Sequence, residues 1–132
     1  MDGDATSREL PTPAAEVRRL PEVQSLEAVL VRFREPVPYA EGAARKEAEA
    51  VVEFRVTTSA EFPIRAEAPA LFVGDAVVTE SRRVGERSYV FRAYGPVNLK
   101  PGAPISLGWI GSGPPQPQAT GFAYRLLGEE RR

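Results

Sequence analysis

Apolar and polar residues alternate along most of the chain from Leu26 onward, and this pattern constrains the fold more than any other feature. In the clearest run, residues 48–58, Val52 and Phe54 fall on one side and Glu53 falls on the other. A period of two is typical of a half-buried β-strand, because successive side chains of a strand point to opposite faces. No helix-length pattern separates these runs, so we expect an all-β fold without parallel β-α-β units.

The alternating runs are separated by turn residues every eight to twelve positions or so, a spacing that is typical of a sandwich or a barrel. We therefore predict an antiparallel β-sandwich of about seven strands. The expected strands cover residues 26–34, 48–58, 62–68, 71–79, 88–94, 105–110 and 122–126.

Three local signals set the expected ends of these strands. Pro36 and Pro38 should end the first strand, because proline cannot donate a hydrogen bond to a sheet. Residues 42–48 have high helix propensity and should form a loop or a single helical turn. Gly85 should supply the positive φ of a hairpin turn between residues 83 and 86.

The length of 132 residues indicates one domain, which we divide into three parts. Residues 1–24 contain three prolines among polar residues and should be a flexible N-terminal segment. Residues 25–128 should form the single sandwich domain, and residues 129–132 a charged, frayed tail.

The corner Leu99–Gly102, which leads into an alternating strand, resembles corners in immunoglobulin-like and fibronectin-like sandwiches. The resemblance implies that general architecture and no particular family. The paired cysteines that flank a tryptophan in true immunoglobulin domains are missing, and Trp109 lies in the sixth expected strand instead of the third.

The chain contains no cysteine and no histidine, and this restricts its chemistry. Disulfides, thiolate metal sites and cysteine nucleophiles are excluded, as are catalytic and metal-binding histidines. Asp2, Asp4 and Asp75 are the only aspartates, so a calcium loop is not expected either. We therefore expect no enzyme activity, no metal and no cofactor.

The charges are balanced, with 17 basic and 18 acidic residues and a net charge of -1. A nucleic-acid-binding domain normally has a basic face, so we expect no nucleic-acid partner. No apolar stretch is long enough to cross a bilayer, and the acidic start does not resemble a signal peptide. We expect no membrane insertion and a cytoplasmic rather than an exported location.

Three glutamates, Glu47, Glu49 and Glu53, fall on one side of the second expected strand. Paired carboxylates can act as acid and base in glycoside hydrolysis. Here we expect them to be solvated partners of arginines such as Arg65 or Arg92, since nothing nearby suggests a pocket.

Apolar residues also occur where the alternation predicts the outer face of the sandwich. If they are neighbours, they form a patch of the kind that marks interaction sites. A second cluster, of arginines around one expected hairpin, is a candidate anion patch. The predicted interaction patch consists of Val51, Val90, Tyr94, Ile110 and Leu127, and the anion patch of Arg82, Arg83, Arg87 and Arg92.

These features favour a non-catalytic protein-interaction or assembly domain that acts through a sheet face or an edge strand. Its partner would be another protein or a second copy of the chain. The alternative is a carbohydrate- or small-ligand-binding module that uses exposed aromatic residues. Tyr39, Tyr94 and Trp109 are the candidates, although Trp109 shares its side of the strand with the core residues Ile105 and Leu107.

Overall fold

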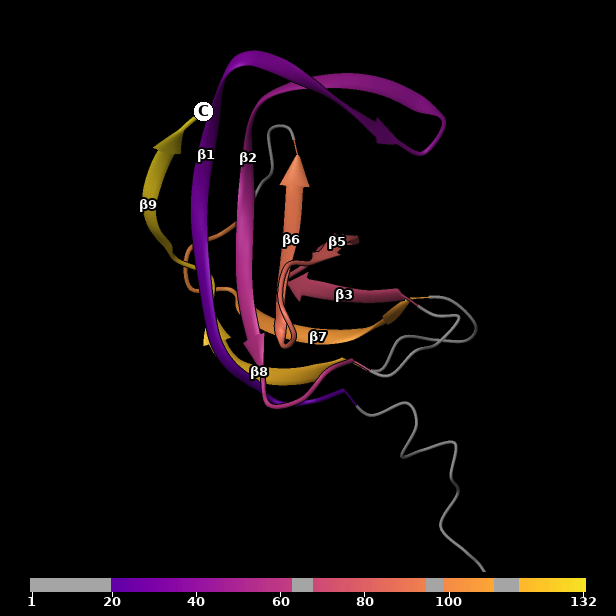
Figure 1. Cartoon of the computed structure of the whole chain (residues 1–132), viewed down its shortest axis with the longest axis vertical. Helices are drawn as coiled ribbons and strands as arrows, with labels where there is room; N and C mark the ends of the chain where they lie inside the picture. Colours follow the sequence, from indigo (N-terminus) through magenta and orange to yellow (C-terminus); the bar gives the residue numbers. More distant parts are fainter. Residues whose placement is uncertain (1–19, 63–67, 95–98, 111–116) are drawn as a thin grey trace, which may run out of the picture.

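The computed structural model describes residues 20–62, 68–94, 99–110 and 117–132, and in these ranges it contains strands and no helix. The strands form two packed sheets (Figure 1), which confirms the predicted all-β sandwich. One sheet has the order β5-β6-β2-β1-β9 and is called sheet A; the other, sheet B, has the order β4-β3-β7-β8. The strands are β1 (Val23–Glu41), β2 (Ala44–Thr58), β3 (Ala68–Val73), β4 (Ala76–Val78), β5 (Glu80–Arg83), β6 (Ser88–Tyr94), β7 (Pro104–Ile110), β8 (Gln118–Ala123) and β9 (Leu126–Arg131).

The main core lies between the two sheets and follows the predicted alternation. Phe54 of β2 and Phe91 of β6 are fully buried and face each other across paired strands. Leu71 and Leu107 oppose them from sheet B. Burying a side chain of this size stabilises the fold by about 1.5–3 kcal/mol relative to exposing it. Trp109 is 5% exposed and belongs to this core, as its position beside Leu107 indicates.

The prediction that β1 ends at Pro36 is wrong, because β1 continues through both prolines to Glu41. Beyond Arg34, β1 pairs with β2 alone, since its last hydrogen bond to the segment after β9 is made by the Arg34 nitrogen. Proline is tolerated where a strand has an open edge or an irregular register, and the register shifts between Arg32 and Val37.

The prediction of a loop or helical turn at residues 42–48 is also wrong, because β2 already begins at Ala44. Gly42 makes a two-residue hairpin turn with φ of 62°. Side-chain pairing across the hairpin overrides the local helix propensity. Residues 33–50 therefore form a two-stranded ribbon, here called the arm, that extends past the rest of sheet A (Figure 1).

The hairpin between β5 and β6 does not use Gly85 as predicted, because Gly85 has no positive φ. The loop is wider, and the backbone nitrogens of Val84 and Gly85 donate to the Ser88 oxygen at 2.9 and 3.2 Å. A loop of this length needs no left-handed residue. Gly74, with φ of 60°, has that conformation in the tight turn between β3 and β4.

The last part of the chain forms two strands where the sequence predicts one. β8 lies in sheet B, and β9 crosses to sheet A and pairs in parallel with β1. Residues 129–131, which the sequence analysis assigns to a tail, form half of β9. Arg132 continues this pairing, since its nitrogen donates to the Arg32 oxygen at 2.7 Å and its oxygen accepts from the Arg34 nitrogen at 2.5 Å.

Some expectations concern residues that lie outside the described ranges. These include most of the expected strand 62–68 and most of the N-terminal segment, residues 1–19. Leu20, the first described residue, is 4% exposed and packs against the main core. The immunoglobulin- or fibronectin-like detail of the architecture stays a prediction.

Candidate functional site

The candidate site is the outer face of sheet A, which points away from sheet B. Odd-numbered residues of β2 point to this face, because the even-numbered Val52, Phe54 and Val56 fill the main core. The outer face of a sandwich sheet is normally solvated. Here Val51 and Glu53 are only 1% and 2% exposed, so this face carries structure of its own.

An outer apolar cluster occupies the part of this face next to the arm. Val29, Val31 and Val51 are buried, and Phe33 and Tyr94 pack against them half-buried. Tyr39 of the arm stacks on Tyr94, with ring centroids 5.0 Å apart and ring planes 8° from parallel. The arm therefore contributes to the cover of an apolar surface that the sandwich would otherwise expose.

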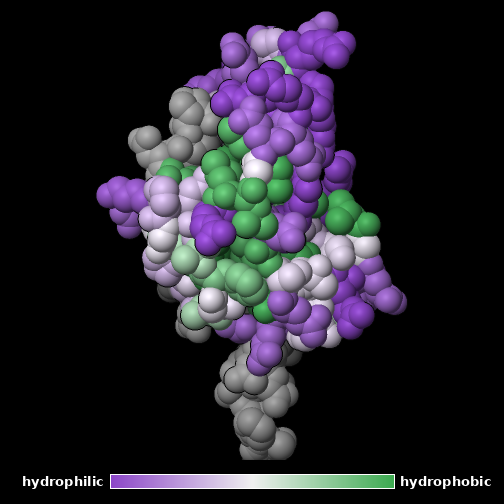
Figure 2. All heavy atoms as spheres, turned by 90° about the vertical axis from the view of Figure 1, so that its left-hand side faces the viewer, coloured by the Kyte–Doolittle hydropathy of each residue, from purple (hydrophilic) through white to green (hydrophobic). Residues whose placement is uncertain are grey.

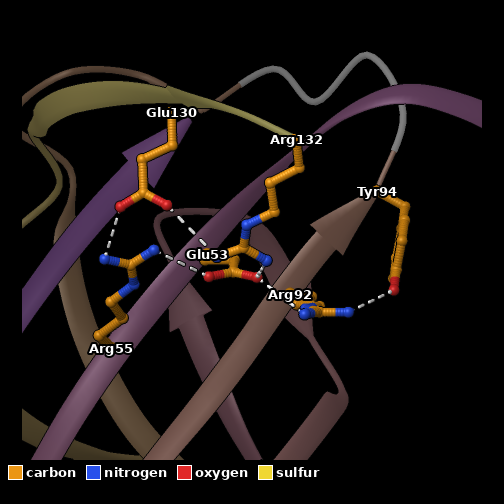
Figure 3. A network of polar contacts seen from close by, with 6 residues as sticks. All are labelled: Glu53, Arg55, Arg92, Tyr94, Glu130 and Arg132. Carbon is orange, nitrogen blue, oxygen red and sulfur yellow. Dashed lines mark hydrogen bonds and ion pairs between the residues drawn. The ribbon is translucent and has the colours of Figure 1, made fainter. Parts of the chain in front are cut away.

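A network of ion pairs lies beside this cluster and has Glu53 at its centre (Figure 3). The Glu53 carboxylate contacts Arg92 at 2.9 Å, Arg55 at 3.2 Å and Arg132 at 3.3 Å. Glu130 of β9 joins it, with contacts of 2.9 Å to Arg55 and 3.3 Å to Arg132. The Glu53 network thus connects the neighbouring strands β2 and β6 with the end of β9, which lies beyond β1 in sheet A.

Hydrogen bonds within the network favour its charged forms. The hydrogen bond to Glu130 raises the pKa of Arg55, and the same contact lowers the pKa of the Glu130 carboxyl below its ordinary value. The hydrogen bond from Arg92 to the Tyr94 hydroxyl, at 3.4 Å, is the largest cause that raises the pKa of Arg92. At neutral pH these side chains form a fixed array of charges.

Of the three glutamates singled out in the sequence, the structure leaves Glu47 and Glu49 exposed and buries Glu53. The expectation that Glu53 is solvated is therefore wrong, although its predicted partner Arg92 is correct. The burial comes from Arg55 and Arg132, which the sequence analysis did not identify. Arg65 lies outside the described residues.

A hollow of about 620 Å³ opens on the same face, and we call it the outer hollow. It lies over β2, β5 and β6, and charged side chains of both signs line it together with the half-buried Val90. Arg82 makes no ion pair with any residue that the structure describes, so its charge is free to act in the hollow. The charged lining consists of Glu27, Glu53, Arg55, Arg82, Arg92, Glu130 and Arg132.

The five residues of the predicted interaction patch are divided among several places. Val51 and Tyr94 are paired neighbours within the outer apolar cluster, and Val90 lines the outer hollow. Ile110 is in sheet B. Leu127 is 56% exposed at the start of β9. Figure 2 shows the side of the molecule that is on the left in Figure 1, and apolar side chains form a band on it.

The four arginines of the predicted anion patch also separate. Arg82 and Arg92 line the outer hollow. Arg83 forms an ion pair with Glu61 instead. Arg87 is exposed in the loop before β6 and does not line the hollow.

This arrangement suits binding through charge and hydrogen bonds. The carboxylate of Glu53 is buried and contacts three arginines. Among the described residues, no group of histidine, cysteine, aspartate or glutamate side chains is placed to hold a metal ion. The same residues include no helix with the length and apolar character of a membrane span.

Sequence reasoning could have found part of this site. Arg55 is two residues from Glu53 and therefore on the same side of β2. Arg132 is 79 residues away from Glu53, and no local pattern relates the two. Comparisons with protein-family models, with curated proteins and with solved structures find no match to this chain.

Proposed function

We propose that this chain is a non-catalytic interaction domain that docks through the outer face of sheet A onto a second copy of itself. The observation that carries the proposal is the outer hollow, in which fixed charges of both signs surround an accessible valine, Val90. The following steps explain why a face is favoured over an edge, and why the partner is the same surface.

The edges of both sheets have features that oppose strand addition. Proteins protect edge strands by making them short, by placing charges on them or by interrupting them. β4 has 3 residues and β5 has 4, and residues 129–131 of β9 are all charged. Gly121, with φ of 84°, interrupts β8, and two prolines lie on the open side of the arm. A sheet face is the better candidate.

The charge pattern of the outer hollow supports a second copy as the partner. In a two-fold symmetric interface each surface meets its own copy, so a surface must complement itself. Four arginines and three glutamates line the hollow. Of these, the exposed Glu27 and Arg82 form no ion pair with the described residues, so Arg82 of one copy can meet Glu27 of the other. Val90 lies between Arg55 and Arg82 on the neighbouring strands and gives the contact an apolar centre.

The first test measures the mass of the chain in solution as its concentration rises, by size exclusion with light scattering. We expect wild type to form a dimer, and Val90→Glu to remain a monomer because it places a carboxylate at the apolar centre. The matched control is Val77→Glu, since Val77 is 49% exposed on β4 of the other sheet and does not line the hollow.

Two results would contradict self-docking through this face. One is a wild-type chain that stays monomeric at the highest attainable concentration. The other is a dimer that Val77→Glu disrupts as strongly as Val90→Glu. Thermal unfolding of both variants confirms that each is folded when its mass is measured.

The carbohydrate alternative has less support. Of its three candidate aromatic residues, Trp109 is 5% exposed in the main core. Tyr39 and Tyr94 stack on each other, so each already uses one ring face. A sugar-binding surface needs an aromatic ring with an exposed face. The burial of Trp109 and the stacking of the two tyrosines reduce the ring area that is available for this.

A further inference from the structure

A second concave site lies at the edge of sheet A, where the end of β9 meets β1. It is a cleft of about 360 Å³ lined by five residues: Arg32, Phe33, Arg34, Arg131 and Arg132. We call it the arginine cleft. Four of the five lining residues are arginines, and they come from two segments nearly 100 positions apart in the chain. The pairing of β9 with β1 creates this cluster.

Backbone hydrogen bonds hold the two segments in register. The Arg132 nitrogen donates to the Arg32 oxygen at 2.7 Å, and the Arg34 nitrogen donates to the Arg132 oxygen at 2.5 Å. Arg131 is the direct partner of Arg32 in the ladder. Because strand pairing fixes the backbone of both segments, the four arginines are attached at defined positions around the cleft.

The glutamate side chains around the cleft are too few to neutralise these arginines. Glu129 contacts Arg32 at 2.7 Å and Arg131 at 3.8 Å, so one carboxylate serves two guanidinium groups. Arg132 contacts Glu53, which also contacts Arg55 and Arg92, and it contacts Glu130, which also contacts Arg55. Arg34 forms no ion pair with any residue in the described ranges. The cleft therefore carries excess positive charge.

We propose that the arginine cleft binds a phosphate group. Guanidinium groups present planar pairs of N–H donors that match the oxygens of phosphate, and phosphate monoesters carry up to two negative charges near neutral pH. Arg34 and Arg131 supply the charges that the protein itself compensates least. A dianion between them would balance these charges and accept hydrogen bonds from both.

This inference does not depend on the proposed self-association. Arg132 lines both sites, but Arg34 and Arg131 do not line the outer hollow, and Val90 does not line the cleft. A phosphate group could come from inorganic phosphate or from a phosphorylated side chain of a partner. Both sources present the same oxygens, so the experiment includes each of them.

The experiment is an NMR titration of the isotope-labelled full chain with inorganic phosphate at pH 7.5 and constant ionic strength. We expect saturable shifts of the backbone amides and arginine Nε–H groups at residues 32–34 and 131–132. A chloride titration at equal ionic strength should not reproduce these shifts, because chloride screens charge generally and does not saturate one site. The second arm uses a phosphoserine peptide and its unphosphorylated form.

Three variants give different expected results. Arg34→Gln removes an arginine without an ion pair and should weaken phosphate binding about fivefold. Glu129→Gln removes the carboxylate that competes for Arg32 and Arg131, so it should strengthen binding. Arg87→Gln changes an exposed arginine outside the cleft and should leave the affinity as it is.

Opposite effects of Arg34→Gln and Glu129→Gln would support the site, since a merely structural disturbance would weaken binding in both. Phosphate shifts that do not saturate, or that chloride reproduces, would overturn it. So would equal weakening by Arg87→Gln and Arg34→Gln. Saturable binding of the phosphopeptide and not of its unphosphorylated form would identify a modified partner as a source of the group.

Discussion

Glu53 lies on the outer side of sheet A and is nevertheless 2% exposed. Burying a carboxylate costs several kcal/mol unless oppositely charged groups and hydrogen bonds compensate it. Here three arginines from β2, β6 and the end of β9 provide that compensation. Glu49, on the same side of the same strand, forms no ion pair with any described residue and remains exposed.

Glu130 predicts how the stability of the domain depends on pH. Its folded pKa is lower than its ordinary value of 4.5, because Arg55 and Arg132 favour the carboxylate. A carboxyl with a depressed folded pKa stabilises the fold above its unfolded pKa, and this stabilisation is lost as the pH falls through the folded pKa. Glu130→Gln should therefore lower the free energy of unfolding at pH 7, and its difference from wild type should shrink as the pH falls from 5 to 3.

Urea denaturation of both proteins at several pH values measures this difference. Glu49→Gln is the matched control, since Glu49 is exposed and makes no ion pair with the described residues. A Glu130→Gln effect that stays constant between pH 7 and pH 3 would show that the carboxylate does not contribute through its charge.

The residue pattern alone predicts which side of β2 Glu53 occupies and gives Arg92 as one of two candidate partners. It does not predict burial, because burial depends on Arg132, which reaches this position through the parallel pairing of β9 with β1. The same pairing creates the arginine cleft. In the sequence, Arg131 and Arg132 are indistinguishable from the charged end of a disordered tail.

At the scale of elements, the arm is the paired region that has the fewest neighbouring strands. Apart from the hydrogen bond between Arg34 and Arg132, its two strands pair only with each other, and a two-stranded ribbon is marginally stable in water. Ala48, 3% exposed, and the stack of Tyr39 on Tyr94 connect it to the sandwich. The arm therefore depends on side-chain contacts more than the other strands do.

Tyr39→Ala should loosen the arm without unfolding the sandwich. An aromatic pair contributes about 0.5–1.5 kcal/mol beyond its buried area, so amide exchange at residues 37–48 should become roughly threefold to tenfold faster. Exchange in β6 should not change. Hydrogen-exchange mass spectrometry of the full chain measures both regions.

Tyr39→Phe serves as the control, because it keeps the ring and removes only the hydroxyl. It should exchange like wild type. If Tyr39→Ala also leaves the arm protected, the ribbon is stabilised by something other than the stack.

The strands that fill the main core were predictable, and the arm was not. β6 has the predicted bounds, because Tyr89, Phe91 and Ala93 recur at every second position and all point into the main core. In the arm, Pro36 and Pro38 normally indicate the end of a strand. They are compatible with β1 only because no strand pairs with its other edge there, and this is a property of the whole sheet.

At the scale of the whole molecule, the main core and the outer apolar cluster share β1, β2 and β6. We therefore expect them to unfold together in one transition, as small single domains usually do. Trp109 is buried in the main core and reports on its packing, whereas far-UV circular dichroism reports on all strands. Urea curves from the two signals should have the same midpoint.

A fluorescence midpoint that differs clearly from the circular dichroism midpoint would mean that the sandwich contains separate cooperative units. The comparison is direct because the chain contains a single tryptophan. Val77→Glu, which changes an exposed residue, should keep both midpoints together.

The parallel pairing of β9 with β1 also has a consequence for protein synthesis. Arg32 and Glu129, which meet in this pairing, are 97 residues apart. At a translation rate of about 5–20 residues per second, β1 leaves the ribosome roughly 5–20 s before its partner is made. During that interval the edge of β1 next to Val29 and Val31 is open, so a nascent chain stalled before residue 126 should recruit chaperones more strongly than one that includes β9.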